Sequence, residues 1–544
     1  MKKIFLLATT LLLSVSFTAC TGKLDNPQKG VIDLETYYAN AGPAECEQLI
    51  AAAYNSFFEM LNVGSGNTLD IMGGDMTNGG GSWSDNANAY RDGQELILTL
   101  GSWPFSSERR GAKMFETFYN LIYRCNLIVD TVPEQAGEVS RIKGEAKAMR
   151  ALGLWEAMKW YGTPPFADHI YGDDDMYAPN GDPAEMIAWI LQNLDEASSQ
   201  LPALPGKGQQ AQIGGRFTAE AAKAYCGKVA VWYGTKYKDN TILQKGQAAL
   251  KAVINSGKYE LIPVEDLFYY RSDFCSEYIM ERNAAEVSVN QLMQNDNRHT
   301  WRGLRFDRIQ VPAGVINYSW GYCLPSKDFV EFMLAHAEGQ GENNPRLRSK
   351  IISYDRLLTL PYAEGTTPGV FEGNTLVDCV GWFNLLGFMW ESEEYGDTGS
   401  DHMSRANDPK LRYADVLLLY AEACIALNSD VADGLAALNK VRVRAGLSPL
   451  SSYTYQDVKD ERRAEMWGER DRYFDLVRWG DAPTVLKDAG KVRYEFYGYK
   501  PGTTEYDIRE SAGLGHGWDD KFLLFPFPDL QLKANENLKQ NPGW

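Results

Sequence analysis

Residues 461–480, ERRAEMWGERDRYFDLVRWG, combine closely spaced carboxylates and arginines with several aromatic side chains. On a helix, Glu461, Glu465 and Glu469 recur at four-residue spacing and therefore share one face. Carboxylates gathered in this way are what acid–base catalysis or a bound metal ion would require. The stretch is therefore the chain's first candidate for a catalytic or metal site.

The arginines of the same stretch favour a different role for these acids. They are interleaved with the carboxylates, at Arg462, Arg463, Arg470 and Arg472. Guanidinium groups at this spacing would occupy the carboxylate oxygens and keep the acids ionised. The apolar residues form a stripe at helical spacing, consisting of Met466, Trp467, Tyr473, Phe474 and Val477. We therefore predict a helix whose charges form a buried ion-pair network against neighbouring helices.

The rest of the chain carries no catalytic or nucleotide-binding pattern. H-E-x-x-H, G-x-S-x-G, the P-loop and G-x-G-x-x-G after a strand are all missing from the sequence. The histidines are scattered over separate segments, at His169, His299, His336, His402 and His516. A glycoside hydrolase needs only two carboxylates, so an enzyme stays open as an alternative. A net charge of −18 without basic blocks argues against a nucleic-acid partner.

Metal and disulfide chemistry also lacks a pattern. The cysteines after Cys20 have neither C-x-x-C spacing nor a zinc-type Cys/His cluster. Three of them lie in helical patterns, at Cys125, Cys226 and Cys424. One bridge stays open among the others in irregular segments, Cys275, Cys323 and Cys379. The acidic loop 172–182 offers calcium ligands but lacks the spacing of an EF-hand, so we expect no cofactor.

Amphipathic helices must position any site in this chain. Residues 146–162, 219–234 and 411–428 repeat small and large apolar side chains at three- and four-residue spacing. A second helix is expected after two of them, at 242–257 and 430–446, each ending at a glycine. Such pairs resemble tetratricopeptide repeats, here irregularly spaced and interrupted by insertions. We predict a mainly α fold.

The N-terminus predicts export and a lipid anchor. Lys2 and Lys3 precede a short apolar run that is too short to span a bilayer and ends at Cys20. This resembles a bacterial lipoprotein signal, although Phe17 departs from the usual leucine; ordinary cleavage, with the cysteine there by chance, is the alternative. We expect a signal peptide over 1–19 and a lipidated tether over 20–36.

The remainder, 37–544, is expected to form one domain, since no linker divides it. Its helical scaffold is predicted over 37–61, 107–290 and 411–480. Two segments, 62–106 and 295–410, are rich in Gly, Asn, Asp, Trp and Tyr and predict loops. Long irregular segments in a helical protein often carry function, so we place the ligand site there.

Several segments together resemble one family. They are the Cys20 signal with LDNP, YNLIYRCN at 119–126, GEAKAMRALGLWEAMKWYGTPPF at 144–166, LRYADVLLLYAEA at 411–423, LNKVRVRAGL at 438–447, residues 461–480 and the ending FPFPDLQLKANENLKQNPGW. These motifs, in this order, are similar to those of the SusD/RagB family of outer-membrane lipoproteins, and the similarity spans essentially the whole mature chain.

The resemblance implies a non-enzymatic nutrient-binding protein, lipid-anchored in the outer membrane and facing the cell exterior. It also implies four tetratricopeptide-like helix pairs, and a partner, a SusC-like TonB-dependent transporter, over which the protein sits as a lid and to which it delivers oligosaccharide. Some relatives carry peptides, so a peptide-binding protein on the same scaffold is the first alternative. A surface glycoside hydrolase is the second.

The chemistry of sugars selects the candidate site residues. Sugar rings stack their C–H faces on Trp and Tyr, and their hydroxyls need Asp, Asn or Arg partners. Trp155, Trp160, Trp232 and Trp467 lie in helical stripes and are expected in the core. The candidates in loops are Trp83, Trp103, Trp301, Tyr318, Trp320 and Tyr395, with Asp70, Asp75, Asn86 and Arg405 as polar companions. The alternatives are loop-core aromatics and turn-forming polar residues.

Overall fold

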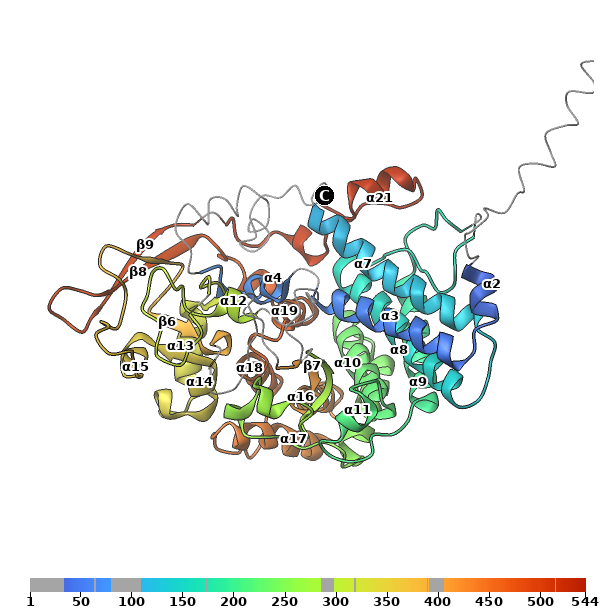
Figure 1. Cartoon of the computed structure of the whole chain (residues 1–544), viewed down its shortest axis with the longest axis horizontal. Helices are drawn as coiled ribbons and strands as arrows, with labels where there is room; N and C mark the ends of the chain where they lie inside the picture. The colour runs from blue at the N-terminus through green and yellow to red at the C-terminus, as the bar shows by residue number, and fades with distance from the viewer. Residues whose placement is uncertain are drawn as a thin grey trace, which may run out of the picture.

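The structure is a computed structural model that describes residues 34–62, 65–79, 109–172, 175–284, 298–317, 319–388, 390, 406–513 and 515–544. In Figure 1 one half of the molecule is a stack of helices, and the other half mixes short helices with small sheets. The expected signal peptide and Cys20 lie outside the described residues.

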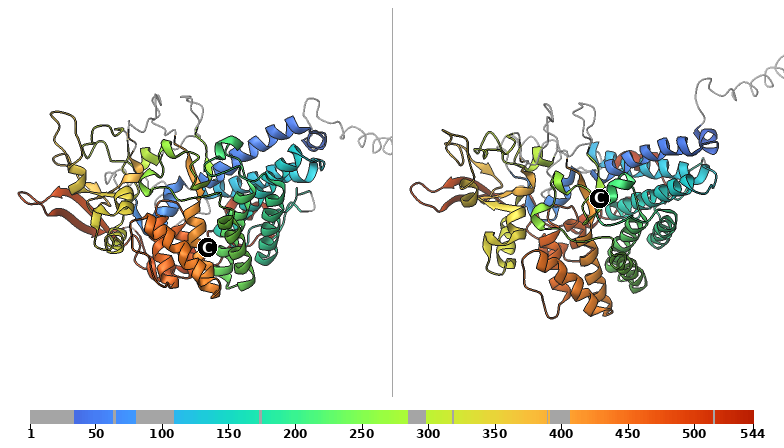
Figure 2. Two further views of the ribbon diagram at one scale, coloured as in Figure 1. Left: turned by 90° about the horizontal axis from the view of Figure 1, so that it is seen from below. Right: turned by 60° about the horizontal axis from the view of Figure 1, so that its bottom comes forward.

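Paired antiparallel helices build the first half. The pairs are α3 (Pro43–Asn62) with α7 (Arg109–Asn126), α8 (Glu138–Tyr161) with α9 (Pro183–Gln200), α10 (Ala219–Tyr237) with α11 (Asn240–Asn255), and α16 (Tyr413–Leu427) with α17 (Val431–Arg444). Each pair also packs on the next, and both views of Figure 2 show α16 and α17 beside α10 and α11. The mainly α, tetratricopeptide-like fold predicted from the sequence is confirmed.

Small residues explain how closely these helices pack, and capping residues explain where they begin and end. A Cβ atom on Gly227 of α10 would lie 2.4 Å from Cγ of Leu250 in α11, so only glycine allows this close approach. Asp182 and Asp239 cap the N-termini of α9 and α11 by accepting backbone N–H bonds. Gly257 and Gly446, expected just beyond the helix ends, have φ of 63° and 77°.

The second half is assembled from shorter elements. Its helices and the outlying ones are α2 (Leu34–Ala39), α4 (Ser65–Met72), α12 (Arg298–Arg302), α13 (Lys327–His336), α14 (Pro345–Lys350), α15 (Tyr354–Leu358), α18 (Tyr455–Glu465), α19 (Arg472–Trp479), α20 (Ala482–Val485) and α21 (Asp529–Ala534). The segment 62–106, expected to be loop-rich, thus contains helix α4, and 295–410 contains α12 to α15.

The strands form small antiparallel sheets. They are β1 (Met76–Thr77) with β3 (Leu324–Pro325), β2 (Tyr278–Arg282) with β7 (Asp408–Arg412), β4 (Ile351–Ser353) with β6 (Trp382–Asn384), and β5 (Leu376–Val377), β8 (Val492–Tyr499) and β9 (Tyr506–Ala512) in one three-stranded sheet. The β8–β9 hairpin projects from the end of the molecule opposite the helix pairs (Figure 1).

The expectation of one continuous helix through 461–480 is wrong. Helix α18 ends at Glu465, a turn follows, and α19 begins at Arg472. The turn contains Gly468 and Arg470, whose φ values are 83° and 75°. Asp70, far away in the sequence, holds this turn because its carboxylate accepts the Arg470 N–H at 2.8 Å. A tertiary contact thus overrides the local helical pattern.

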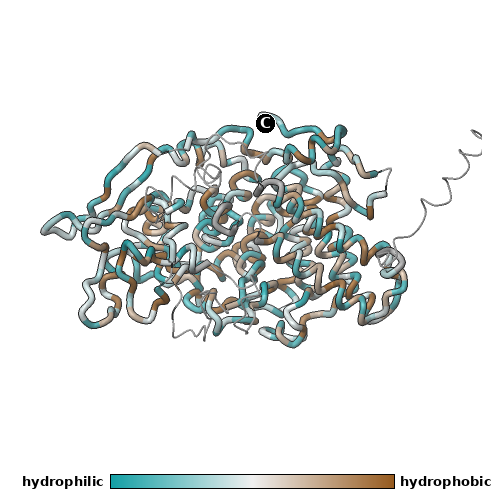
Figure 3. The backbone as a smooth tube through the Cα atoms, turned by 45° about the horizontal axis from the view of Figure 1, so that its top comes forward, coloured by the Kyte–Doolittle hydropathy of each residue, from teal (hydrophilic) through white to brown (hydrophobic). Residues whose placement is uncertain are grey.

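The apolar core consists of separate clusters in the two halves of the molecule. The largest apolar cluster fills the helix pairs, and a second one lies under β4, β6 and β8. Figure 3 shows hydrophobic residues recurring at short intervals along the helices. None of the described helices combines the length and apolar character that a membrane crossing needs. The described cysteines are free thiols, so no bridge joins Cys275, Cys323 and Cys379.

A buried carboxyl on β2 predicts a pH-dependent stability. Glu281 is 1% exposed, and its oxygens accept bonds from the Phe274 N–H and the Asn407 amide. Burial raises the pKa of Glu281 to about 8, with a further increase from Asp273. The folded protein therefore keeps a proton that the unfolded chain loses above its own pKa of 4.5. The stability from this group is complete below pH 4.5 and is lost as the pH rises towards 8.

Replacing Glu281 with glutamine imitates the protonated acid and should remove this contribution. We measure the free energy of unfolding in urea for both proteins at pH 5 and at pH 9. The difference between Glu281→Gln and the wild type should shift in favour of the variant by roughly a few kcal/mol from the lower to the higher pH. Glu510→Gln on exposed β9 is the control and should follow the wild type at both pH values. An equal difference between wild type and Glu281→Gln at both pH values would contradict the prediction.

Candidate functional site

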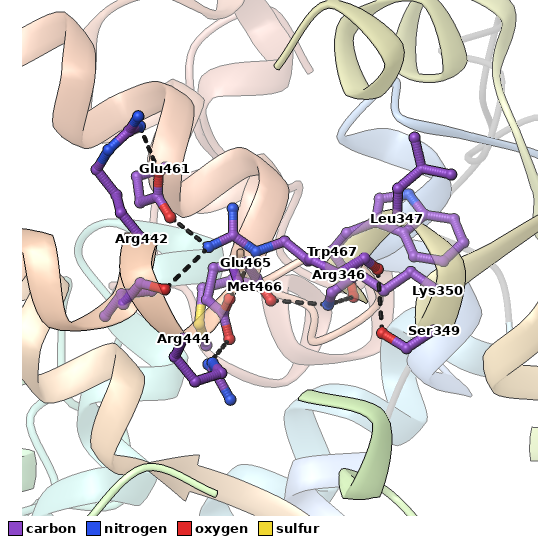
Figure 4. Close-up of polar contacts among 12 residues, drawn as sticks. Arg346, Leu347, Ser349, Lys350, Arg442, Arg444, Glu461, Glu465, Met466 and Trp467 are labelled. Atoms are coloured by element: carbon purple, nitrogen blue, oxygen red, sulfur yellow. Dashed lines mark hydrogen bonds and ion pairs between the residues drawn. The ribbon is translucent and has the colours of Figure 1, made fainter. Parts of the chain in front are cut away.

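The charged stretch 461–480 forms a buried ion-pair network. Glu465 is fully buried; its carboxylate pairs with Arg412 at 2.8 Å, with Nε of Arg346 at 2.9 Å, and with Arg444. Glu461 pairs with Arg346, and with Arg442 at 3.2 Å. Figure 4 shows Arg346 from α14 and Arg442 and Arg444 from α17 meeting the two glutamates of α18. The network thus joins elements of the two halves, as predicted for an ion-pair seam.

The electrostatics of the network argue against acid–base chemistry. Burial alone would raise the pKa of Glu465, but Arg444, Arg412 and Arg346 hold it well below its usual range. Arg346 and His336 together likewise outweigh burial at Glu461, whose pKa is also lowered. Paired cations therefore hold both acids ionised, which argues against a role for either of them as a general acid or base.

The predicted ligand residues fall into two groups. Those outside the described residues are Trp83, Asn86, Trp103, Tyr318, Tyr395 and Arg405. Those that the structure places are Asp70, Asp75, Trp301 and Trp320. The helical tryptophans expected in the core are buried, with exposures of 3% for Trp155, 3% for Trp160, 4% for Trp232 and 3% for Trp467.

Trp301 and Trp320 form an exposed aromatic pair. They are 39% and 38% exposed, and the other tryptophans of the described chain are more deeply buried. Their ring centres are 6.3 Å apart and the planes differ by 28°. Tyr322 lies beside them, with its ring centre 5.7 Å from that of Trp301. We call these three residues the aromatic platform.

Backbone hydrogen bonds fix the platform. The Trp320 N–H donates to the Thr300 carbonyl and the Tyr322 N–H donates to the Trp301 carbonyl, both at 2.7 Å. The guanidinium of Arg305 lies 5.5 Å from the Trp320 ring centre. Sequence reasoning missed Tyr322 and Arg305. The W-x-Y spacing of 320–322 was the available signal, because alternate residues of an extended segment share a face.

An internal ion pair anchors the platform to the scaffold. Arg302, the residue after Trp301, is 1% exposed and donates to Asp70 at 2.8 Å and to the Gly468 carbonyl at 3.3 Å. Asp70 also accepts the Arg470 N–H, so one carboxylate connects α4, α12 and the turn after α18. Trp301 is therefore presented on a rigid support.

Asp70 and Asp75, the predicted polar companions, both lie in buried ion pairs. Asp75 is 3% exposed and pairs with Arg463 at 2.6 Å and with Arg472 at 3.0 Å. Both oxygens of Asp70 and Oδ1 of Asp75 accept hydrogen bonds from protein groups, and Oδ2 of Asp75 forms the ion pair with Arg472. Contact of either acid with a ligand stays a prediction. Asp70 supports the platform through Arg302, whereas Asp75 connects Arg463 with Arg472.

Gly387 lies so close to the backbone of Arg302 in α12 that a side chain there should destabilise the protein. A Cβ atom there would lie 2.4 Å from the backbone carbon of Arg302. We expect Gly387→Ala to lower the free energy of unfolding by about 1–3 kcal/mol, because α12 must shift. Gly172→Ala, whose Cβ would meet no atom within 4 Å, is the matched control in denaturant unfolding. Equal stabilities of the two variants would contradict this account of the support.

The described residues offer no site for a metal ion. Within them, no group of His, Cys, Asp or Glu side chains is arranged to hold one. In the acidic loop considered for calcium, Asp175 instead lies 3.0 Å from the His169 ring, and residues 173–174 are outside the description.

The fold has clear relatives. Residues 372–544 match the model of the SusD family. A SusD-like protein of Bacteroides ovatus is 24% identical, over 99% of this chain and 98% of that protein. A laminarin-binding SusD-like protein superimposes with a TM-score of 0.69 at 23% identity, covering 91% of this chain and 99% of that chain. Surface glycan-binding protein A of Bacteroides thetaiotaomicron, in complex with laminarihexaose, gives 0.69 at 18% identity, covering 92% and 99%.

Proposed function

Because this chain belongs to the SusD/RagB family, we propose that it binds glycans at the cell surface and releases them chemically unchanged. The observation that carries the proposal is the exposed Trp301–Trp320 pair, held in place before any ligand arrives. Similar folds that bind laminarin or are named for glycan binding support the same ligand class.

The platform suits a chain of sugars for physical reasons. Each tryptophan buries a large area against the C–H face of a sugar ring with little loss of side-chain entropy. The two planes are inclined by only 28°, so neighbouring sugar units of one oligosaccharide can lie on both rings. The backbone bonds and the Arg302–Asp70 pair hold the rings in place, which reduces the ordering cost of binding.

Anchoring and delivery complete the proposal. The chain would be attached to the outer membrane through lipid on Cys20, facing outward, and would pass oligosaccharide to a SusC-like TonB-dependent transporter. Family membership and the cysteine-ended N-terminal signal support this part. The buried and paired state of Glu461 and Glu465 is consistent with a binding protein that performs no chemistry.

Calorimetric titration of the purified protein against a panel of oligosaccharides, with laminarihexaose and unrelated peptides included, tests the proposal. We expect saturable binding of at least one oligosaccharide, and chromatography of the mixture after incubation should show the sugar intact. Binding of peptides alone would instead establish the RagB-like alternative. Shortened sugar products would identify a glycoside hydrolase.

A further inference from the structure

A groove with a volume of about 430 Å³ lies between α4, β1, the N-terminus of α13, α20 and β8. This volume is in the range of pockets that hold small ligands. Trp301, Trp320 and Tyr322 are not among its lining residues, so the groove is separate from the aromatic platform. It is therefore a second place on the described chain where a ligand can be held.

The carboxylates that line this groove are already balanced by cations. Four of them belong to described residues, and each has an ion-pair partner. The pairs are Asp75 with Arg463 and Arg472, Asp328 with Arg463, Asp378 with Arg493, and Asp488 with Lys491. Four acids thus meet four different cations, so these pairs contribute no net charge to the groove.

Two further lysines make the groove positively charged. Lys327 and Lys487 line it and are exposed, and neither forms an ion pair within the described residues. The Nζ of Lys327 lies 5.6 Å from the ring centre of Tyr494. Lys487 lies near Asp488, whose pKa is lowered first by Lys491 and further by Lys487. Because the acids are already balanced, these two lysines leave the groove positive, in a chain whose net charge is −18.

The rest of the lining distinguishes between kinds of anion. The side chains of Asp328 and Asp488 are 77% and 71% exposed, and each forms its ion pair through one oxygen, so the other oxygen can accept a hydroxyl donor. Val485 and Val492 add exposed apolar surface. Sulfate lacks hydroxyl donors and an apolar face. A sugar acid brings one carboxylate for the lysines, hydroxyls for the aspartates and a C–H face for the valines.

We propose that this groove binds a sugar acid, with the carboxylate of one uronate unit held by Lys327 and Lys487. The uronate can be a free monosaccharide or one unit of a longer glycan. The inference goes beyond the proposed function, because the groove recognises charge, whereas the platform recognises the faces of sugar rings.

Calorimetric titration of the full chain with glucuronate and galacturonate, and with glucose and galactose as their neutral counterparts, tests the proposal. We expect one saturable site for at least one uronate and none in the groove for the neutral sugars. Higher ionic strength should weaken binding, because the lysines are exposed. A trimer of the preferred uronate separates the two sources: tighter binding of the trimer identifies a unit of a glycan, and equal affinity identifies the free sugar acid.

Variants of the two lysines locate the site. Lys327→Met should weaken uronate binding roughly tenfold, since it removes a charged hydrogen-bond donor, and Lys327→Met with Lys487→Met should abolish it. Lys440→Met is the matched control, because it removes an exposed lysine of α17 that lies outside this groove. This control should bind uronate as the wild type does.

The double alanine variant of Trp301 and Trp320 separates this proposal from glycan binding at the platform. It should keep full affinity for the uronate, whatever the platform itself binds. A loss of uronate binding in this variant would place the sugar acid on the platform and overturn the inference. So would unchanged affinity in the double lysine variant, sulfate binding as tight as uronate binding, or no saturable uronate binding in the wild type.

Discussion

Replacing Trp301 and Trp320 together with alanine is expected to abolish measurable binding of the best oligosaccharide in the panel. Each residue is more than a third exposed, and the two ring centres lie 6.3 Å apart. Aromatic side chains at the centre of a binding surface commonly contribute 2 kcal/mol or more. We therefore expect about a thirtyfold loss of affinity for Trp320→Ala alone.

The measurement is calorimetric titration, with unfolding curves to show that both variants remain folded. Tyr123→Ala, which removes a 47% exposed aromatic ring from α7, is the control and should bind normally. Full affinity in the double variant would rule out the platform as the binding site. The site would then have to be sought at the candidates outside the described residues, and Trp83→Ala would be the first of these variants to measure.

Replacing Arg412 with methionine is expected to give the largest loss of stability of any single change in the network. Arg412 is 1% exposed and pairs with Glu277 at 2.7 Å, Glu465 at 2.8 Å and Glu469 at 2.7 Å. Methionine fills much of the space but leaves three carboxylates without their shared cation. Breaking a buried pair in this way costs about 3–5 kcal/mol.

Denaturant unfolding followed by tryptophan fluorescence measures this effect. Arg509→Met on β9 is the matched control, because it removes the same side chain from an exposed pair with Asp507. Exposed pairs contribute about 0–1 kcal/mol, so this control should differ little from the wild type. A loss below about 1 kcal/mol for Arg412→Met would show that the network does not hold the two halves together.

The helices are the part of the fold that sequence patterns predicted well. The segments 146–162, 219–234 and 411–428 became α8, α10 and α16 because apolar periodicity and small residues act over a few neighbouring positions. The same local reasoning failed at residues 466–471. There the contact of Asp70 with the Arg470 N–H bends the chain, and no pattern within the stretch itself records a partner so distant in the sequence.

The candidate site, like the fold, could be predicted from the sequence only in part. Residue types and loop composition were enough to select Trp301 and Trp320, but their contact depends on the pairing of 300–301 with 320–322 and on the Arg302–Asp70 ion pair. By itself the sequence determined a helical scaffold, a charged stretch rich in arginine, and loops rich in aromatic residues. Only the tertiary structure decided which cations meet Glu461 and Glu465 and which rings lie together. Those contacts join residues far apart in the chain, and their energies depend on burial, which local periodicity does not specify.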